Sequence, residues 1–274
     1  MSRTDQLVPP ETENPIRRFV QAHPLATFIV LAYMVNWAAV LVLGDPLGSG
    51  PFFVAVFVLS MTKGWPGIRA LFGQMTRWRV NWKWYAVAVG LPSGAAVLSA
   101  LATIALGAPR PTSAQIGLWT EIIPFFLFAL IVPLLGPWEE PGFRGFALSR
   151  LMRERSIFTS GLIVGVVIVF WHMPLFFTGD IPMGDVVLIM AGAVVFAWMV
   201  VGTGGSVLLA MIMHATNNAV SGEYISPMFT GTDAEILGWI RAGIWCVFAA
   251  AVLLTNPHLM SRPRSEPIPA SVAG

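Results

Sequence analysis

Charged residues are scarce in this chain. Only 11% of its 274 residues are Asp, Glu, Lys or Arg, whereas a soluble domain usually carries about 25%. This leaves too little polar surface to cover a globule in water, and a hydrophobic content of 56% indicates that the surrounding solvent is lipid. The composition therefore predicts a multi-pass protein of the cell membrane, with membrane lipid as a partner.

Cysteine and clustered basic charge are also lacking. The single cysteine, Cys246, excludes an intramolecular disulfide and lies in an apolar run, where it is best interpreted as a small apolar side chain. The Lys and Arg residues are scattered and the net charge is only +2, which argues against nucleic-acid binding. The glycines of residues 201–206 lack the lysine and the strand of a phosphate-binding loop.

Long apolar runs are abundant. Because a backbone in lipid must satisfy its own hydrogen bonds, these runs predict an all-α fold with about eight transmembrane helices. We place them at residues 24–43, 47–62, 84–106, 118–138, 157–177, 183–202, 204–221 and 235–256. The first run has bilayer length rather than the shorter core of a cleaved signal. Residues 24–256 are thus the expected membrane domain, and residues 1–23 and 257–274 are expected to be tails, disordered or lying on the surface.

The basic residues predict the orientation of these spans. With a cytoplasmic N-terminus, 14 of the 16 Lys and Arg residues fall on the inner side, and only Arg110 and Arg241 lie outside. Both termini are therefore expected in the cytoplasm. Residues 66–85, rich in Trp and Arg, are predicted to form an interfacial amphipathic helix, a membrane anchor or alternatively a docking site for substrate.

The end of the fourth apolar run contains the sequence Trp-Glu-Glu-Pro-Gly-Phe-Arg, residues 138–144. Glu140 and Arg144 are four residues apart, so on a helix they are expected to form an ion pair. Glu139 projects about 100° away and has no such partner. A free carboxylate in a low-dielectric setting is a usable general base, although both glutamates could instead be ordinary loop charges.

Two later spans contain further polar residues. His172 lies in an apolar run two residues before Pro174, which predicts a break in the helix beside it. His214 and Asn218 are four residues apart and are expected to share one helical face. A hydrogen-bonded core histidine, and interhelical hydrogen bonding by His214 and Asn218, are the structural alternatives.

Together these residues are of the types that a hydrolytic site needs. A glutamate can activate water, a histidine can share its proton, and His and Asn donors can stabilise an oxyanion. Alternatively, Glu139, His172 and His214 offer the two-histidine, one-carboxylate pattern of a catalytic zinc site. A proton- or ion-coupled transporter is a third reading, because buried ionisable residues also form relays.

The three groups resemble the motifs of the CPBP family, the CAAX-protease and bacteriocin-processing family, also called Abi proteins. The likeness covers residues 118–221: Glu139, Glu140 and Arg144 match its Glu-Glu-x3-Arg motif, His172 its Phe-x3-His motif, and His214 with Asn218 its His-x3-Asn/Asp motif. It implies an intramembrane endopeptidase of an eight-helix core that acts on a peptide or a lipidated protein near the cytoplasmic face.

By that resemblance, Glu139 and His172 activate the water, His214 and Asn218 form the oxyanion pocket, and Glu140 with Arg144 fixes the motif helix. No cofactor is favoured, with zinc as the alternative. Ile168 stands where the family usually has an aromatic residue, which leaves the pocket wall open, and Phe170 and Trp171 are the nearby candidates to fill that space. A catalytically silent scaffold is a further alternative, and the sequence does not select a substrate.

Overall fold

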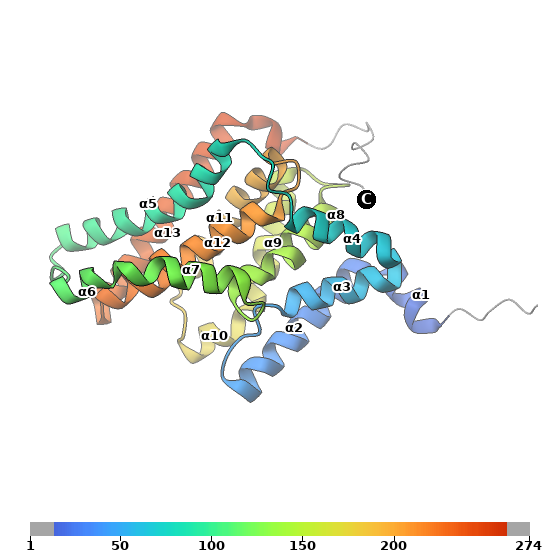
Figure 1. Ribbon diagram of the computed structural model, residues 1–274, viewed down its shortest axis with the longest axis horizontal. Coiled ribbons are helices and arrows are strands. Elements are labelled where there is room, and N and C mark those ends of the chain that lie inside the picture. Colours follow the sequence, from blue (N-terminus) through green and yellow to red (C-terminus); the bar gives the residue numbers. More distant parts are fainter. Residues whose placement is uncertain (1–13, 262–274) are drawn as a thin grey trace, which may run out of the picture.

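The computed structural model describes residues 14–261, in which every regular element is helical (Figure 1). By length and composition, five segments are long and apolar enough to cross a membrane: α2 (Pro24–Leu43), α5 (Trp82–Ala105), Ser113–Glu139, α11 (Gly184–Gly202) and α13 (Gly231–Thr255). The shorter apolar helices α3 (Gly50–Thr62) and α9 (Ile157–Trp171) accompany them. The all-α, polytopic membrane fold is confirmed, while the count of eight spans and the cytoplasmic termini stay predictions.

Several predicted spans are composite. The Ser113–Glu139 segment is divided into successive short helices, and the predicted span 204–221 is α12 continued by a π-helix. The remaining elements are α1 (Pro15–Ala22), α4 (Gly64–Met75), α6 (Ser113–Gly117), η1 (Leu118–Glu121), α7 (Ile122–Ile131), η2 (Gly136–Glu139), η3 (Pro141–Leu148), α8 (Ser149–Leu151), α10 (Met173–Thr178), α12 (Val207–Thr216), η4 (Asn217–Ile225), η5 (Ser226–Met228) and η6 (Pro257–Met260).

Helix α12 is the central element of the bundle. It contacts α5, α7, α11, η2 and η3, and its ribbon runs between those of α5 and α7 (Figure 1). Leu209 and Met213 are fully buried there. On the other side of the bundle, α11 packs between α9 and α13. Helix α12 continues directly into η4, and the polar residues at this junction, His214, Asn217 and Asn218, are half-buried.

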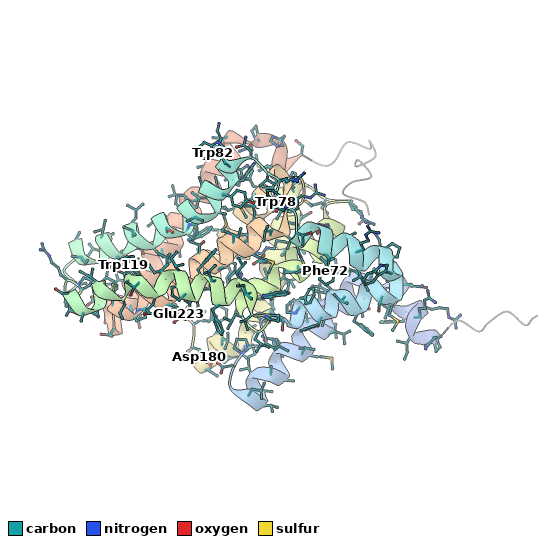
Figure 2. All side chains as sticks on the ribbon, in the orientation of Figure 1. Phe72, Trp78, Trp82, Trp119, Asp180 and Glu223 are labelled. Atoms are coloured by element: carbon teal, nitrogen blue, oxygen red, sulfur yellow. The ribbon has the colours of Figure 1, made fainter. Side chains whose placement is uncertain are left out.

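The predicted helix over residues 66–85 is wrong in its second half. Helix α4 ends at Met75, and α5 begins at Trp82 because the Asn81 side chain accepts a hydrogen bond from the Lys83 backbone N–H at 3.0 Å. The segment between them is non-helical. Trp78 and Trp82 are nevertheless exposed, as expected for residues of the headgroup layer (Figure 2).

Part of the predicted N-terminal tail is ordered. Helix α1 starts after Asn14, whose side chain caps it, and lies against α3. Val20 is buried, and the Gln21 side chain donates to the Met61 carbonyl at 3.3 Å. The tail is thus surface-lying over residues 15–22. In the predicted C-terminal tail, residues 257–260 form η6, in which Leu259 is buried. Residues 1–13 and 262–274 of the two predicted tails lie outside the described residues.

Candidate active site

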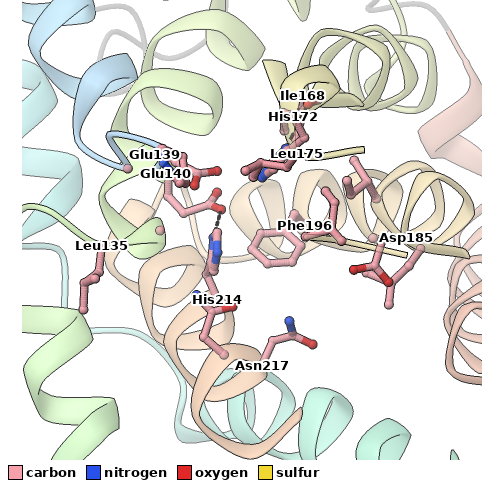
Figure 3. Close-up of a pocket in the computed structure, with 18 of the residues that line it drawn as sticks. Leu135, Glu139, Glu140, Ile168, His172, Leu175, Asp185, Phe196, His214 and Asn217 are labelled. Carbon is pink, nitrogen blue, oxygen red and sulfur yellow. Dashed lines mark hydrogen bonds and ion pairs between the residues drawn. The ribbon is translucent and has the colours of Figure 1, made fainter. Parts of the chain in front are cut away.

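A cavity of about 730 Å³ lies where the three motifs meet. All the residues predicted from sequence line it: Glu139, Glu140, Arg144, His172, His214 and Asn218. Figure 3 shows Glu139, Glu140, His172 and His214 around this space. Most of the remaining wall is apolar, with Leu43, Leu134, Leu135, Ile168, Leu175, Ile181, Leu188, Ile189 and Phe196. A mainly apolar cavity with a few converging polar groups is the usual form of a ligand-binding or catalytic site.

The glutamate motif is held by close packing against α3. Glu139 ends η2, and the following η3 is a π-helix, a form that recurs at functional sites. A Cβ on Gly142 would lie 2.5 Å from the Pro51 carbonyl oxygen, so only glycine permits this approach of the two backbones. The packing sets where the two glutamate side chains leave the backbone.

Glu140 is bound on both of its carboxylate oxygens. Its Oε2 lies 3.1 Å from Nε of Arg144, and its Oε1 lies 2.7 Å from Nδ1 of His214. Glu140 is only 1% exposed and Arg144 only 5%. The predicted ion pair is therefore confirmed, and the contact with His214 ties the first motif to the third. The Arg144 guanidinium also lies over the Phe196 ring, 4.7 Å from its centroid.

Glu139 has different surroundings. It is 5% exposed, yet no hydrogen bond or ion pair joins its carboxylate to another described side chain. It lines the cavity beside Glu140 (Figure 3). One glutamate is thus bound into the protein framework, and the other presents an unpaired carboxylate to the cavity.

His172 lies at a break between two helices. Helix α9 ends at Trp171 and α10 begins at Met173, as the proline at 174 predicts. Nδ1 of His172 lies 3.0 Å from the Ile168 carbonyl oxygen. A carbonyl can only accept, so we assign the ring proton to Nδ1. The lone pair is then on Nε2, and the ring faces the two glutamates across the cavity (Figure 3).

Three side chains of α2 stabilise this break, and the sequence analysis missed them. Asn36 donates to the Trp171 carbonyl at 2.9 Å, the Trp37 indole to Phe170 O at 3.2 Å, and the Tyr33 hydroxyl to Val167 O at 3.0 Å. The last carbonyls of a helix have no partner within it, and Pro174 has no N–H to offer Phe170. A buried asparagine in the first apolar run was the available signal.

His214 and Asn218 converge on one point with Glu139. A methyl group on Gly136 would lie 2.8 Å from Nε2 of His214, 3.0 Å from Nδ2 of Asn218 and 3.4 Å from Oε1 of Glu139. The shared face of His214 and Asn218 is therefore confirmed, and Gly136 forms the floor between the three groups. Sequence reasoning missed Gly136, because nothing in its local pattern indicates what lies above it.

An ion pair at the cavity wall also escaped the sequence analysis. Asp185 of α11 lines the cavity, and its Oδ1 lies 3.0 Å from Nη2 of Arg241 on α13. Arg241 further donates to Ser226 at 3.2 Å and to Ser221. The charge distribution predicts Arg241 on the outer side of the membrane, and in the structure its side chain is buried.

Neither Phe170 nor Trp171 fills the space beside Ile168, so that expectation is wrong. Phe170 is 45% exposed, and Trp171 packs edge-on against Phe143 away from the cavity. Ile168 itself lines the cavity together with Phe196 from α11 (Figure 3). The aromatic wall therefore comes from another helix, which the spacing around His172 cannot indicate.

The zinc alternative has no matching cluster. Among the described residues, no group of three His, Cys, Asp or Glu side chains is placed to hold a metal ion. The set Glu139, His172 and His214 thus does not form a ready metal site in this geometry.

The region that contains the three motifs is similar to a known protein family. Residues 118–220 match the model of the type II CAAX prenyl endopeptidase Rce1-like family. This region of the chain is therefore similar to that family. The chain is also 26% identical to the CAAX prenyl protease 2 of Methanococcus maripaludis over 152 residues, which are 51% of this chain and 52% of the relative. The chain thus spans about half the length of this relative. The residues that match the family model, 118–220, include every predicted site residue.

Proposed function

We propose that this chain is an intramembrane endopeptidase that hydrolyses a peptide bond near the cytoplasmic face of the membrane. The observation that carries this proposal is the convergence of Glu139, His214 and Asn218 over Gly136. A carboxylate and two nitrogen groups around one point, inside an apolar cavity, form the arrangement that water addition to a carbonyl requires. The CAAX-protease match supports the same reaction.

In the proposed reaction, water is activated on one side of the site. Glu139 accepts a proton from a water molecule, and Nε2 of His172, whose other nitrogen faces Ile168 O, accepts a hydrogen bond from the same water. The water oxygen forms a bond to the peptide carbonyl carbon, and the carbonyl π electrons move to its oxygen.

The resulting oxyanion is stabilised on the other side. Nδ2 of Asn218 donates to it, and Nε2 of His214 donates when its ring carries both protons, with the Glu140 carboxylate beside Nδ1 as counter-ion. The intermediate then re-forms the C=O bond and breaks the C–N bond. The proton held by Glu139 passes to the leaving amine, so Glu139 returns to its starting state.

The proposed substrate is a peptide or protein whose cleavage site lies beside an attached lipid. The apolar wall of the cavity can hold the attached lipid next to the reacting carbonyl. The relative from Methanococcus maripaludis is named a CAAX prenyl protease, which fits a prenylated substrate. A prenylated peptide should therefore be cleaved with a higher kcat/KM than the same peptide without its lipid.

The test is cleavage by the purified full chain in detergent. Glu139→Gln and His172→Ala should each abolish cleavage of a prenylated peptide while the Tm stays close to wild type. The matched control is Glu154→Gln, which removes an exposed carboxylate far from the cavity and should cleave normally. Wild-type turnover in both site variants would contradict the assignment, and ion flux in proteoliposomes without any proteolysis would favour the transporter.

The metal-free form of the mechanism has its own test. Activity should survive incubation with a strong chelator, and elemental analysis should find less than stoichiometric zinc. Loss of activity on chelation that added zinc restores would replace the proposed glutamate mechanism with a metal-dependent one.

A further inference from the structure

A second polar site lies on the far face of the motif helix η3. It is a niche of about 30 Å³ between α3, α4, η3 and α8. Its walls include the basic residues Lys63, Arg150 and Arg153, together with Gln74 and Ser149. No carboxylate lines it. This site is separate from the cavity of the proposed reaction, because Arg144 points to one side of η3 whereas Gly145 and Phe146 face the niche.

The three cations have no counter-ion among residues 14–261. None of the ion pairs in this part of the chain involves Lys63, Arg150 or Arg153. Burial and the neighbouring Arg153 lower the pKa of Arg150 to about 10, and burial with both arginines lowers the pKa of Lys63. Like charges held together in this way disfavour one another, so an anion bound among them would relieve the repulsion.

Arg150 is also held in place. Its guanidinium lies over the Phe146 ring, 3.6 Å from the centroid. A side chain fixed over an aromatic face loses less conformational freedom when it binds a ligand. The guanidinium therefore offers preorganised donors of the kind that recognise phosphate oxygens.

The size of the niche limits the ligand. A cavity needs roughly 10–15 Å³ of such volume for one water molecule, so this niche admits the oxygens of one anionic group but not an acyl chain. Trp65 and Phe72, which are exposed on α4, indicate that the surrounding surface lies in the lipid headgroup layer. A phosphate at this depth would belong to a lipid whose acyl chains extend beside the protein.

We propose that Lys63, Arg150 and Arg153 bind the phosphate of an anionic phospholipid headgroup. This inference does not depend on the proposed proteolysis. Binding at the niche would join α3, α4 and η3, the elements that fix the glutamate motif, so the lipid would stabilise the fold around the site.

The test measures thermal unfolding of the full chain in neutral detergent. Dihexanoyl phosphatidylglycerol, dihexanoyl phosphatidylcholine and inorganic phosphate are each titrated, and the rise in Tm gives an apparent Kd for each. We expect phosphatidylglycerol to bind most tightly. Inorganic phosphate that matched it would make free phosphate the ligand of the same site and overturn the lipid assignment.

Variants locate the binding. Arg150→Gln with Arg153→Gln should weaken the phosphatidylglycerol response about tenfold or more, because two charge-assisted contacts are lost. The matched control, Arg69→Gln with Lys83→Gln, removes the same charge from exposed positions outside the niche and should respond like wild type. If the double niche variant does not fold, the single variant Lys63→Gln should still bind phosphatidylglycerol several-fold more weakly. Equal responses of niche and control variants would overturn the proposal.

Discussion

Nδ1 of His214 lies 2.7 Å from Oε1 of Glu140, and this contact joins residues that are 74 positions apart in the chain. The other oxygen of Glu140 meets Arg144. Glu140 therefore connects the motif helix to α12, the central helix of the bundle. It fixes the ring whose opposite nitrogen points to the space above Gly136.

The first prediction concerns Glu140. Glu140→Gln keeps the size of the side chain but leaves the Arg144 charge buried without its counter-ion. Breaking a buried pair in this way usually costs about 3–5 kcal/mol, so a clear fall in Tm is expected together with loss of activity. Glu139→Gln, which removes an unpaired carboxylate, should lose activity with little change in Tm. Equal Tm values for the two variants would contradict this division of roles.

The second prediction concerns the floor of the site. Gly136→Ala would place a methyl group 2.8 Å from Nε2 of His214 and 3.0 Å from Nδ2 of Asn218. Displacement of these groups by about 1 Å should reduce kcat roughly 100-fold. Gly90→Ala is the matched control, because a methyl group there meets nothing within 4 Å and helix propensity favours alanine. An active Gly136→Ala variant would show that the three groups do not act at this point.

The third prediction concerns the support of His172. Asn36 donates to Trp171 O and accepts from the Leu47 N–H at 3.2 Å, and it is fully buried. Asn36→Ala leaves these backbone groups unpaired and should destabilise the protein by about 1–3 kcal/mol, with a fall in kcat because the end of α9 shifts. Tyr33→Phe removes one partly buried hydrogen bond and should have the smaller effect. The free energy of unfolding by denaturant and kcat, measured on both variants, check that Asn36→Ala has the larger effect on each.

The fourth prediction concerns Asp185 and Arg241. Asp185→Asn should lower Tm, because Arg241 is buried and keeps only its serine partners. Arg241→Met combined with Asp185→Asn should recover part of that loss, since no buried charge is left unpaired. If the fall in Tm of the double variant equals the sum of the falls for Asp185→Asn and Arg241→Met alone, the two side chains are not coupled.

Much of the site followed from the sequence. Glu140 and Arg144 pair as their spacing predicts, and the break beside His172 falls where Pro174 requires it. Both features depend on a few neighbouring residues, whose geometry along a helix is fixed by its period. The single helix expected over 66–85 is interrupted, because α4 ends at Met75 and Asn81 caps the start of a new helix, α5.

The sequence by itself determined the membrane residence, the all-helical fold and the polar residues of the site, because hydropathy, helical period and residue chemistry are local properties. Only the tertiary structure decided that His214 binds Glu140, that Gly136 is the floor, and that Asn36 supports the end of α9. Contacts between distant segments depend on how the helices cross, and a single stretch of sequence carries no record of that geometry.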